Sequence, residues 1–229
     1  MNTLDSSRVA DLLDTLHRQA AASDHAHATA MMARMEAPGM SIETLVADIL
    51  ESEQDYRATY RDYADNFLAV SPDYGRFLYA IARACQATRI VEFGTSMGIS
   101  TLYLAAALRD NGGGQLIGSE LEPAKVARAR ANLDAAGLGD LADIRAGDAL
   151  ETLRDVGGEI DLLLVDGAFS LYLPVLRLLE PRLKAGAVIL GENAFEPGYR
   201  AYVRDPANGY VSLALPDESR GNEFTVKLS

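Results

Sequence analysis

Tryptophan is absent from this sequence, cysteine occurs once, and basic residues are fewer than acidic ones. The single cysteine, Cys85, cannot form a disulfide within the chain or a cysteine-rich zinc site, and it is consistent with a reducing compartment. Lysine and arginine number 21 against 33 acidic residues, which gives a formal net charge of −12. A protein that binds nucleic-acid phosphates needs a basic face, so these numbers favour a small-molecule ligand over a nucleic acid.

Long apolar runs are also missing. No stretch approaches about 18 consecutive apolar residues, so we expect no membrane span. Residues 1–10 include Asp5 and contain no apolar segment of the kind found in signal peptides, so we expect a cytoplasmic protein. The 229 residues, 48% of them hydrophobic and 24% charged, are typical of one folded α/β domain with an extension rather than of two full domains.

The pattern of residues 1–64 predicts an all-helical N-terminal extension. Apolar residues recur at helical spacing near its start, and an alanine-rich stretch follows until Pro38-Gly39 interrupts it. Ser41 and Ser71 each precede a further helical segment and are suited to cap its first turn. These N-terminal helices carry more apolar surface than the main domain needs for its core, which predicts that they form the interface of a homodimer.

Strand-like and helical segments alternate from Thr88 onward. Alternation of this kind implies βαβ units and a doubly wound α/β fold with a parallel sheet. The last two strand-like segments are separated only by a loop, which predicts an antiparallel hairpin at the edge of a seven-stranded sheet. The expected strands are residues 90–93, 115–120, 141–145, 160–165, 187–190, 210–215 and 223–228.

A turn with two glycines follows the first expected strand, where a doubly wound sheet binds nucleotide-like ligands. Gly94 and Gly98 permit a close approach of the backbone, and Ser100 is placed to cap the next helix. Glu120 ends the second strand, where a carboxylate can accept hydrogen bonds from both hydroxyls of a ribose. The spacing is not G-x-G-x-x-G, so a dinucleotide is less favoured, and an ordinary structural turn is the alternative.

Together with further motifs in the same order, these features resemble the class I S-adenosylmethionine-dependent methyltransferases. Within that group the chain is similar to the small-molecule O-methyltransferases typified by catechol O-methyltransferase. The resemblance extends over residues 65–229, which it implies form the cofactor-binding, Rossmann-like methyltransferase domain, and leaves residues 1–60 mostly outside. The matching motifs are Val70–Gly75, Val91–Thr101, Gly118–Glu120, Gly147–Ala149, Val165–Gly167 and Glu192–Asn193.

The resemblance implies roles for the matching residues in holding S-adenosyl-L-methionine. Glu92, Gly94 and Ser100 would hold the methionine part of the cofactor, and Val70 and Ser96 would line the same end. Glu120 would bind the ribose, and residues 148–149 would border the adenine. The complete predicted cofactor site is Val70, Glu92, Gly94, Ser96, Gly98, Ser100, Glu120, Asp148, Ala149 and Asp166.

Three residues that follow the fourth and fifth parallel strands predict a metal site. Asp166, Glu192 and Asn193 offer two carboxylates and an amide oxygen, which suit Mg²⁺ or another hard divalent cation and not Zn²⁺. Such a cation would lower the pKa of a bound hydroxyl and orient it for in-line methyl transfer. The resemblance implies the same three positions. Asp166 and Glu192 are therefore the candidate catalytic residues, and the alternative is that all three only cap or orient neighbouring groups.

Three positions depart from the pattern of the related enzymes, and all lie on the acceptor side. Phe169 stands where those enzymes have a lysine that acts as general base, and Ala168 stands where many have a tryptophan. Glu192 replaces an aspartate, which matters to Mg²⁺ because this ion demands near-ideal distances. Ala168, Phe169 and Tyr172 form the predicted substrate pocket, which we expect to be roomier at one point and more apolar at another than a catechol pocket.

The predicted function is methyl transfer from S-adenosylmethionine to a small molecule, with O-methylation in specialised metabolism favoured. Loss of a general base typically lowers the reaction rate about 10²–10⁴-fold. Much of the rate of methyl transfer, however, comes from the alignment of donor and acceptor. The alternative is a repurposed fold, such as a cyclase, an isomerase or a binding protein. In the related enzymes N-terminal helices cover the acceptor pocket, yet the helical spacing of Tyr56, Tyr60 and Tyr63 favours packing over substrate contact.

Overall fold

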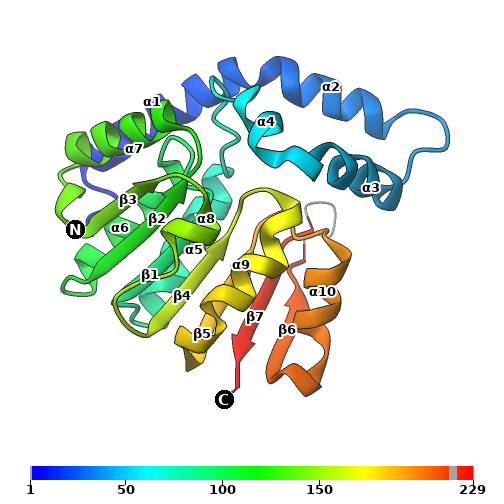
Figure 1. Ribbon diagram of the computed structural model, residues 1–229. Helices are drawn as coiled ribbons and strands as arrows, with labels where there is room; N and C mark the ends of the chain where they lie inside the picture. The colour runs from blue at the N-terminus through cyan, green and yellow to red at the C-terminus, as the bar shows by residue number, and fades with distance from the viewer. Residues whose placement is uncertain (1, 217–220, 229) are drawn as a thin grey trace.

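Seven strands form one sheet in the order β3-β2-β1-β4-β5-β7-β6, as the computed structural model shows for residues 2–216 and 221–228 (Figure 1). Strands β1 to β5 are parallel, and β7 lies antiparallel between β5 and β6. The predicted doubly wound fold and C-terminal hairpin are confirmed. The strands are β1 (Arg89–Phe93), β2 (Gln115–Glu120), β3 (Ala142–Ala146), β4 (Ile160–Val165), β5 (Leu183–Gly191), β6 (Tyr210–Ala214) and β7 (Glu223–Lys227).

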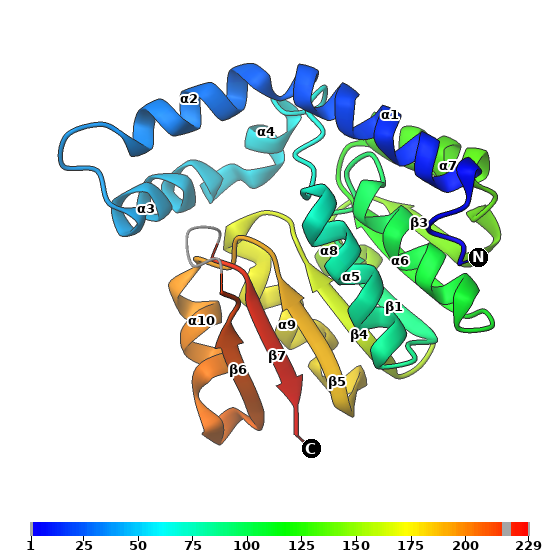
Figure 2. The ribbon, with the colours of Figure 1, turned by 180° about the vertical axis from the view of Figure 1, so that it is seen from behind.

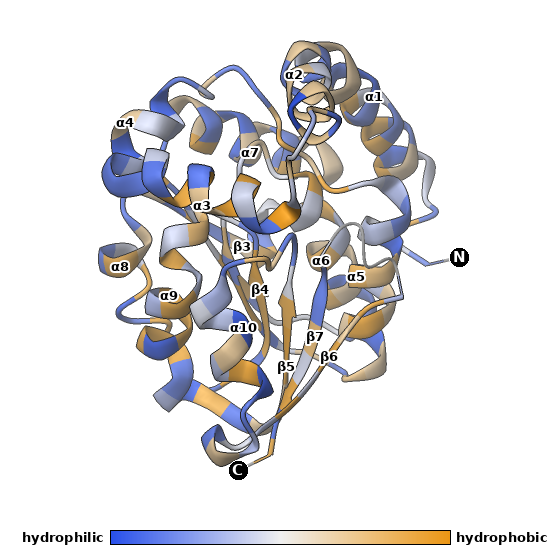
Figure 3. Cartoon of the chain, turned by 90° about the vertical axis from the view of Figure 1, so that its right-hand side faces the viewer, coloured by the Kyte–Doolittle hydropathy of each residue, from blue (hydrophilic) through white to orange (hydrophobic). Residues whose placement is uncertain are grey.

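The central strands are apolar because helices cover both faces of the sheet. In β4, Leu162 to Val165 have no exposed surface, and Figure 3 shows this strand mostly in the hydrophobic colour. Asp161 is the exception, and it lies at the amino end of the strand. Its carboxylate accepts hydrogen bonds of 2.8 Å from the backbone N–H groups of Thr88 and Arg89. Asp161 thus has a structural role at the amino edge, and the residues that line the cavity described below lie at the opposite, carboxyl edge of the sheet.

Two layers of helices enclose the sheet. Helices α5, α6 and α7 pack with α1 on one face, and α8, α9 and α10 pack on the other, so the core is divided into two clusters (Figure 2). The helices are α1 (Ser7–Ser23), α2 (His25–Met35), α3 (Ile42–Ser52), α4 (Tyr56–Arg61), α5 (Pro72–Ala84), α6 (Ile99–Asp110), α7 (Pro123–Ala136), α8 (Ala149–Thr152), α9 (Tyr172–Leu179) and α10 (Pro197–Arg204).

Two of the three predicted helix caps, those at Ser41 and Ser71, are confirmed, and the third, at Ser100, is wrong. The side chains of Ser41 and Ser71 accept hydrogen bonds from the first turns of α3 and α5. Gly98, at φ 87°, precedes α6 instead of Ser100. Ser100 lies one residue inside the helix, where its hydroxyl has a buried partner, Glu92, that competes with capping.

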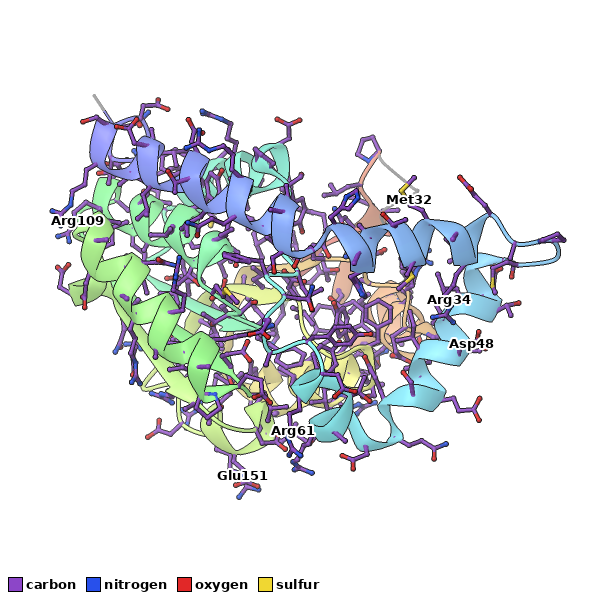
Figure 4. The ribbon with its side chains drawn as sticks, turned by 90° about the horizontal axis from the view of Figure 1, so that it is seen from above. Met32, Arg34, Asp48, Arg61, Arg109 and Glu151 are labelled. Atoms are coloured by element: carbon purple, nitrogen blue, oxygen red, sulfur yellow. The ribbon has the colours of Figure 1, made fainter. Side chains whose placement is uncertain are left out.

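The N-terminal extension crosses the carboxyl ends of the parallel strands. Helices α1 and α2 lie nearly in line, and α3 returns beneath α2 (Figure 1). Asp24 separates α1 from α2 because its carboxylate accepts hydrogen bonds from the backbone N–H groups of Phe67 and Leu68, 2.8 and 2.7 Å long. Figure 4 shows Arg34 of α2 and Asp48 of α3 pointing toward one another, and their ion pair is 3.0 Å long.

Within residues 2–216 and 221–228, no helix combines the length and the apolar character that crossing a bilayer requires.

Candidate functional site

A cavity of about 580 Å³ lies between the carboxyl edge of the sheet and the N-terminal helices α2, α3 and α4. Its floor is made by the loops that follow β1, β2, β3, β4 and β5, and its roof by side chains of the extension. The carboxyl edge of a doubly wound sheet is the place where this architecture binds ligands. One cavity is therefore lined by residues of both the N-terminal extension and the domain that contains the sheet.

The glycine turn after β1 forms one wall of the cavity. Gly94 adopts φ 93°, and a Cβ atom added to it would lie 1.8 Å from the carbonyl oxygen of Asp166. The N–H groups of Gly94 and Thr95 both donate to the carbonyl oxygen of Ser119, at 3.1 Å. Only glycine fits at this crossing, because the loops that follow β1 and β4 are in backbone contact there.

Glu92 is buried behind this turn. Its carboxylate accepts hydrogen bonds from the hydroxyls of Ser100 (2.7 Å), Thr95 (2.8 Å) and Thr101 (2.6 Å). Burial raises the pKa of Glu92, and the three hydroxyl hydrogen bonds oppose this shift. The side chain consequently ties β1 to the first turn of α6 and fixes the shape of the glycine turn.

Glu120 lies at the end of β2, beside the same turn. One carboxylate oxygen accepts a hydrogen bond from the backbone N–H of Ser96 (2.7 Å), and the other accepts one from the N–H of Glu122 (2.8 Å). The residue is 9% exposed and lines the cavity. Two backbone hydrogen bonds orient the carboxylate, and each oxygen keeps a further lone pair to accept from a ligand.

Asp148 connects the sheet edge to the N-terminal extension. One of its oxygens caps α8 by accepting from the N–H of Leu150 (2.9 Å), and the other accepts from the Tyr56 hydroxyl (2.5 Å) and from the Arg57 guanidinium. Burial acts to raise the pKa of Asp148, but these hydrogen bonds and the Arg57 charge outweigh it and lower the pKa. Helix α4 is thus held against the adenine end of the predicted cofactor site.

Acidic and aromatic residues gather at the other end of the cavity. Asp166 and Glu192 line it from the ends of β4 and β5. Burial first, then the charges of Glu192 and Glu92, raise the pKa of Asp166 well above its ordinary value. The Tyr172 hydroxyl donates to the carbonyl oxygen of Glu192 at 2.6 Å, and the side-chain N–H of Asn193 donates to the Glu192 carboxylate.

The side chains around these acidic groups are apolar and aromatic, and they come both from the segment after β4 and from the extension. Phe169 and Tyr172 meet edge to face, with ring centroids 5.5 Å apart. Tyr56, Tyr60 and Tyr63 line the cavity from the extension. Sequence spacing favoured internal packing for these three tyrosines, whereas tertiary structure turns them into the wall. The apolar side chains of α2 and α3 in this wall are Met31, Met35, Ile42, Leu45, Val46 and Ile49.

The structure brings most of the predicted site residues together at this cavity. Four predicted cofactor residues, Val70, Glu92, Gly98 and Ser100, lie outside its lining. Gly98 instead permits close packing of α6 on α7, since an added Cβ would lie 3.1 Å from the Ala129 side chain. The predicted residues that line the cavity are Gly94, Ser96, Glu120, Asp148, Ala149, Asp166, Ala168, Phe169, Tyr172, Glu192 and Asn193.

Sequence reasoning missed two buried charged residues in the lining, Glu53 and Lys125. Lys125 lies on α7, and burial lowers its pKa while the charge of Glu120 opposes that shift. Glu53 lies in a single 3₁₀ turn, Glu53–Asp55, between α3 and α4. Its segment matches no motif, and a glutamate among polar neighbours looks exposed, so no sequence signal indicated its burial.

The comparisons with known proteins agree with this geometry. A family model described as a methyltransferase domain matches residues 91–194. Catechol O-methyltransferase of Niastella koreensis is 32% identical over 166 residues, which cover 69% of this chain and 74% of that protein. Catechol O-methyltransferase of Mycobacterium tuberculosis is 34% identical over 163 residues, which cover 69% of this chain and 73% of that protein.

Solved structures of O-methyltransferases are also similar to this chain. The O-methyltransferase TomG from Streptomyces achromogenes, involved in tomaymycin synthesis and solved in complex with S-adenosylmethionine, superposes with a TM-score of 0.63 at 25% identity. The match covers 77% of this chain and 89% of that one. An O-methyltransferase from Bacillus cereus in complex with S-adenosylhomocysteine has a TM-score of 0.63 at 20% identity, covers 92% and 99% of the two chains, and supports the fold.

The fold and the cavity at its carboxyl edge thus define a class I methyltransferase. The chain belongs to the S-adenosylmethionine-dependent O-methyltransferases, in the family that includes the catechol O-methyltransferases of these two bacteria. The predicted fold and activity are confirmed, and the repurposed fold is not favoured.

Proposed function

We propose that the protein transfers the methyl group of S-adenosylmethionine to a hydroxyl group of a small, mostly apolar aromatic acceptor, of the catechol or phenol type. The observation that carries this proposal is that one cavity contains both the predicted cofactor residues at the sheet edge and the predicted acceptor residues. Glu120 lines one end, the acidic residues Asp166 and Glu192 line the other, and the glycine turn lies between them, with apolar and aromatic side chains around the acidic end. A cationic methyl donor and a flat acceptor can meet in such a space.

The chain's own groups supply binding and alignment of the two reactants. We assign the ribose hydroxyls to Glu120, the adenine to the loop at Asp148 and Ala149, and the methionine part to the turn at Gly94 and Ser96. Side chains of the roof would hold the acceptor flat and exclude water. Alignment of this kind pays in advance the entropy cost of a bimolecular encounter, and it supplies much of the rate of a methyl transfer.

We expect Glu120→Ala to weaken S-adenosylmethionine binding about 100-fold, because hydrogen bonds to a charged group contribute about 1.5–3 kcal/mol each. Isothermal titration calorimetry measures the effect. Glu151→Ala is the control: its side chain on α8 is 63% exposed and lies on the outer surface in Figure 4. An affinity of the Glu120 variant within threefold of the wild type contradicts the ribose assignment.

We also propose a divalent cation, Mg²⁺ in the first instance, held by Asp166, Glu192 and Asn193. The donor set fits, because hard cations prefer carboxylate and amide oxygens, and all three residues line one end of the cavity. Within the described part of the chain no group of three or more His, Cys, Asp or Glu side chains could hold a metal, and the proposed site has two carboxylates and the amide oxygen of Asn193 instead. The cation supplies Lewis acidity that lowers the pKa of an acceptor hydroxyl.

Phe169→Lys tests the acceptor side. A lysine here restores the amine that related enzymes have at this position, so we expect a rise of about tenfold or more in the rate on weakly acidic phenols, within the range of general-base effects. Steady-state kinetics on catechol and on substituted phenols measure it. Phe169→Met, which restores no base, is the control. Equal rates and equal acceptor preference for the lysine and methionine variants place Phe169 outside the acceptor pocket.

The N-terminal extension, residues 1–64, is proposed both to cover the acceptor pocket of the domain at residues 65–229 and to form a homodimer. Helix α2 supports the second role, because none of its residues is buried and Met32 is 62% exposed. The proposal includes a cytoplasmic location, a role in specialised metabolism and no nucleic-acid partner. Light scattering after size-exclusion chromatography tests the dimer, and the mass of one chain contradicts it.

The decisive test of the proposed function has two stages. Calorimetry with S-adenosylmethionine and S-adenosylhomocysteine, with and without Mg²⁺, measures cofactor binding, and mass spectrometry then detects methylated catechols and phenols. We expect binding and Mg²⁺-dependent turnover. Binding without turnover on any hydroxyl would favour a repurposed fold, and absence of binding contradicts the proposal entirely.

A further inference from the structure

Because Phe169 stands where related enzymes have a lysine, the predicted acceptor pocket has no amine at this position to accept a proton. A carboxylate, that of Glu53, lies against the loop that contains Phe169. Glu53, 3% exposed, accepts hydrogen bonds from the backbone N–H of Phe169 (3.2 Å) and of Ser170 (2.7 Å). The same carboxylate accepts a hydrogen bond of 3.0 Å from the hydroxyl of Tyr60. Glu53 and Tyr60 both line the cavity.

The Tyr60 hydroxyl lies close to the reacting end of the cavity. It is 3.5 Å from the carbonyl oxygen of Gly167, the residue that follows Asp166. Asp166 is also near enough for its charge to contribute to the raised pKa of Tyr60, after burial and Glu53. The hydroxyl therefore stays protonated, and its proton is directed toward Glu53 while its lone pairs remain available to accept.

We propose that Tyr60 and Glu53 together replace the missing lysine as the proton acceptor of methyl transfer. Tyr60 is the catalytic residue, because its hydroxyl touches the acceptor hydroxyl, and Glu53 is a positioning residue that receives the proton through Tyr60. This inference rests on the proposed O-methylation. It assigns a chemical task to residues of the extension, which lies outside the motifs that the family shares.

The step balances in atoms and charge. The acceptor oxygen forms a bond to the methyl carbon with one of its lone pairs, and the carbon–sulfur bond breaks with its electron pair left on sulfur. The acceptor proton passes to the Tyr60 oxygen while the proton of Tyr60 passes to the Glu53 carboxylate. A cationic sulfonium, a neutral hydroxyl and a carboxylate thus become a thioether, a methyl ether and a neutral carboxylic acid, which later releases its proton to water.

A carboxylate is a weak base, but it suffices at this stage of the reaction. An oxygen that is forming its new bond to carbon carries growing positive charge, so its proton becomes far more acidic than in the free phenol. Preorganised groups aimed at charge that develops in the transition state are the effective ones. The three hydrogen bonds that Glu53 accepts hold it in that orientation.

Tyr60→Phe is the sharpest test, because it removes the relay hydroxyl and leaves the contacts of Glu53 with residues 169 and 170 in place. The rates of wild type and variant are compared over substituted catechols and phenols of graded hydroxyl pKa. We expect a loss of about 100-fold in kcat on weakly acidic acceptors, in the range of general-base effects. On a nitro-substituted catechol already ionised at the assay pH we expect the loss to fall below about threefold, since no proton remains to be accepted.

Two further variants separate chemistry from structure. Glu53→Gln keeps the size of the side chain and is expected to reproduce the same dependence on acceptor pKa. Tyr202→Phe removes a hydroxyl that likewise donates to a glutamate, Glu180, at 2.8 Å, but outside the cavity, and it is expected to leave the rates unchanged. The affinity for S-adenosylmethionine is measured in parallel and should stay within twofold for all three variants.

A uniform loss in Tyr60→Phe across the series, or no loss, overturns the relay. If the wild type methylates none of these acceptors, the proposed function itself fails and the relay fails with it. The two failures are distinguished because the first requires an active wild-type enzyme.

Discussion

Replacing Gly94 by alanine is expected to abolish measurable S-adenosylmethionine binding and to lower the stability of the protein by about 2–5 kcal/mol. The added Cβ would lie 1.8 Å from the carbonyl oxygen of Asp166 and 2.6 Å from its carbon, and both are backbone atoms that cannot rotate away. Forced expansion of this kind costs about 1–3 kcal/mol, and a left-handed backbone costs a non-glycine residue about 1–2 kcal/mol. For a chain of this size the Tm should fall by about 10 °C.

Gly186→Ala is the matched control for this experiment. Gly186 lies in β5 with φ 82°, close to the φ of Gly94, but an added Cβ would meet nothing within 4 Å. The Gly186→Ala substitution introduces the backbone strain without the collision. We therefore expect a loss of stability of only about 1–2 kcal/mol and unchanged cofactor binding. Differential scanning calorimetry and titration calorimetry measure the two effects. Equal losses in the two alanine variants would mean that strain alone, and not the crossing with Asp166, makes Gly94 necessary.

The second large effect is expected from Asp166→Asn, which should lower kcat/KM about 10²–10³-fold. The backbone of Asp166 forms the crossing with Gly94, and the residue lines the cavity at the end of β4. The substitution preserves its shape but removes the charge that would face a cationic donor and a divalent metal. Loss of one preorganised electrostatic contact of this type costs about 2.7–4 kcal/mol in the transition state.

The same variant is expected to be at least as stable as the wild type when no ligand is present. Burial, Glu192 and Glu92 all raise the pKa of Asp166, so its charged form is disfavoured in the free protein. Removing that charge relieves repulsion. Asp140→Asn, at an exposed ion pair with Arg109, is the charge-matched control and should change neither activity nor Tm. A destabilised Asp166 variant with wild-type kcat would assign the residue to folding and not to function.

Short-range patterns were sufficient to predict that Gly94 and Glu120 lie together at the carboxyl edge of the sheet. Gly94 and Glu120 each lie at the end of a strand, and a parallel sheet brings such ends to one edge whatever the remaining sequence does. The C-terminal hairpin followed from the same reasoning, since two strand-like segments joined by a loop pair antiparallel. Ser100 was misplaced as a cap because its buried partner, Glu92, lies on a different element.

The acceptor side depended on contacts between residues far apart in the chain. Tyr60 has a helical spacing that fits packing equally well, and only the position of α4 over the sheet turns it toward the cavity. The break between α1 and α2 depends on Asp24 meeting the backbone at residues 67 and 68. Glu53 has no signal of its own, because its hydrogen-bonding partners include the N–H groups of residues more than 100 positions away.

The sequence by itself determined the α/β fold, the cofactor class and the absence of a lysine at position 169, because each of these depends on local periodicity or on a few residues at a strand end. Tertiary structure alone decided which residues line the cavity in which we propose that the acceptor binds. The extension contributes its side chains to the cavity only after it folds across the sheet, and the buried carboxylate of Glu53 becomes a candidate proton acceptor only through the loop and the tyrosine that it meets there.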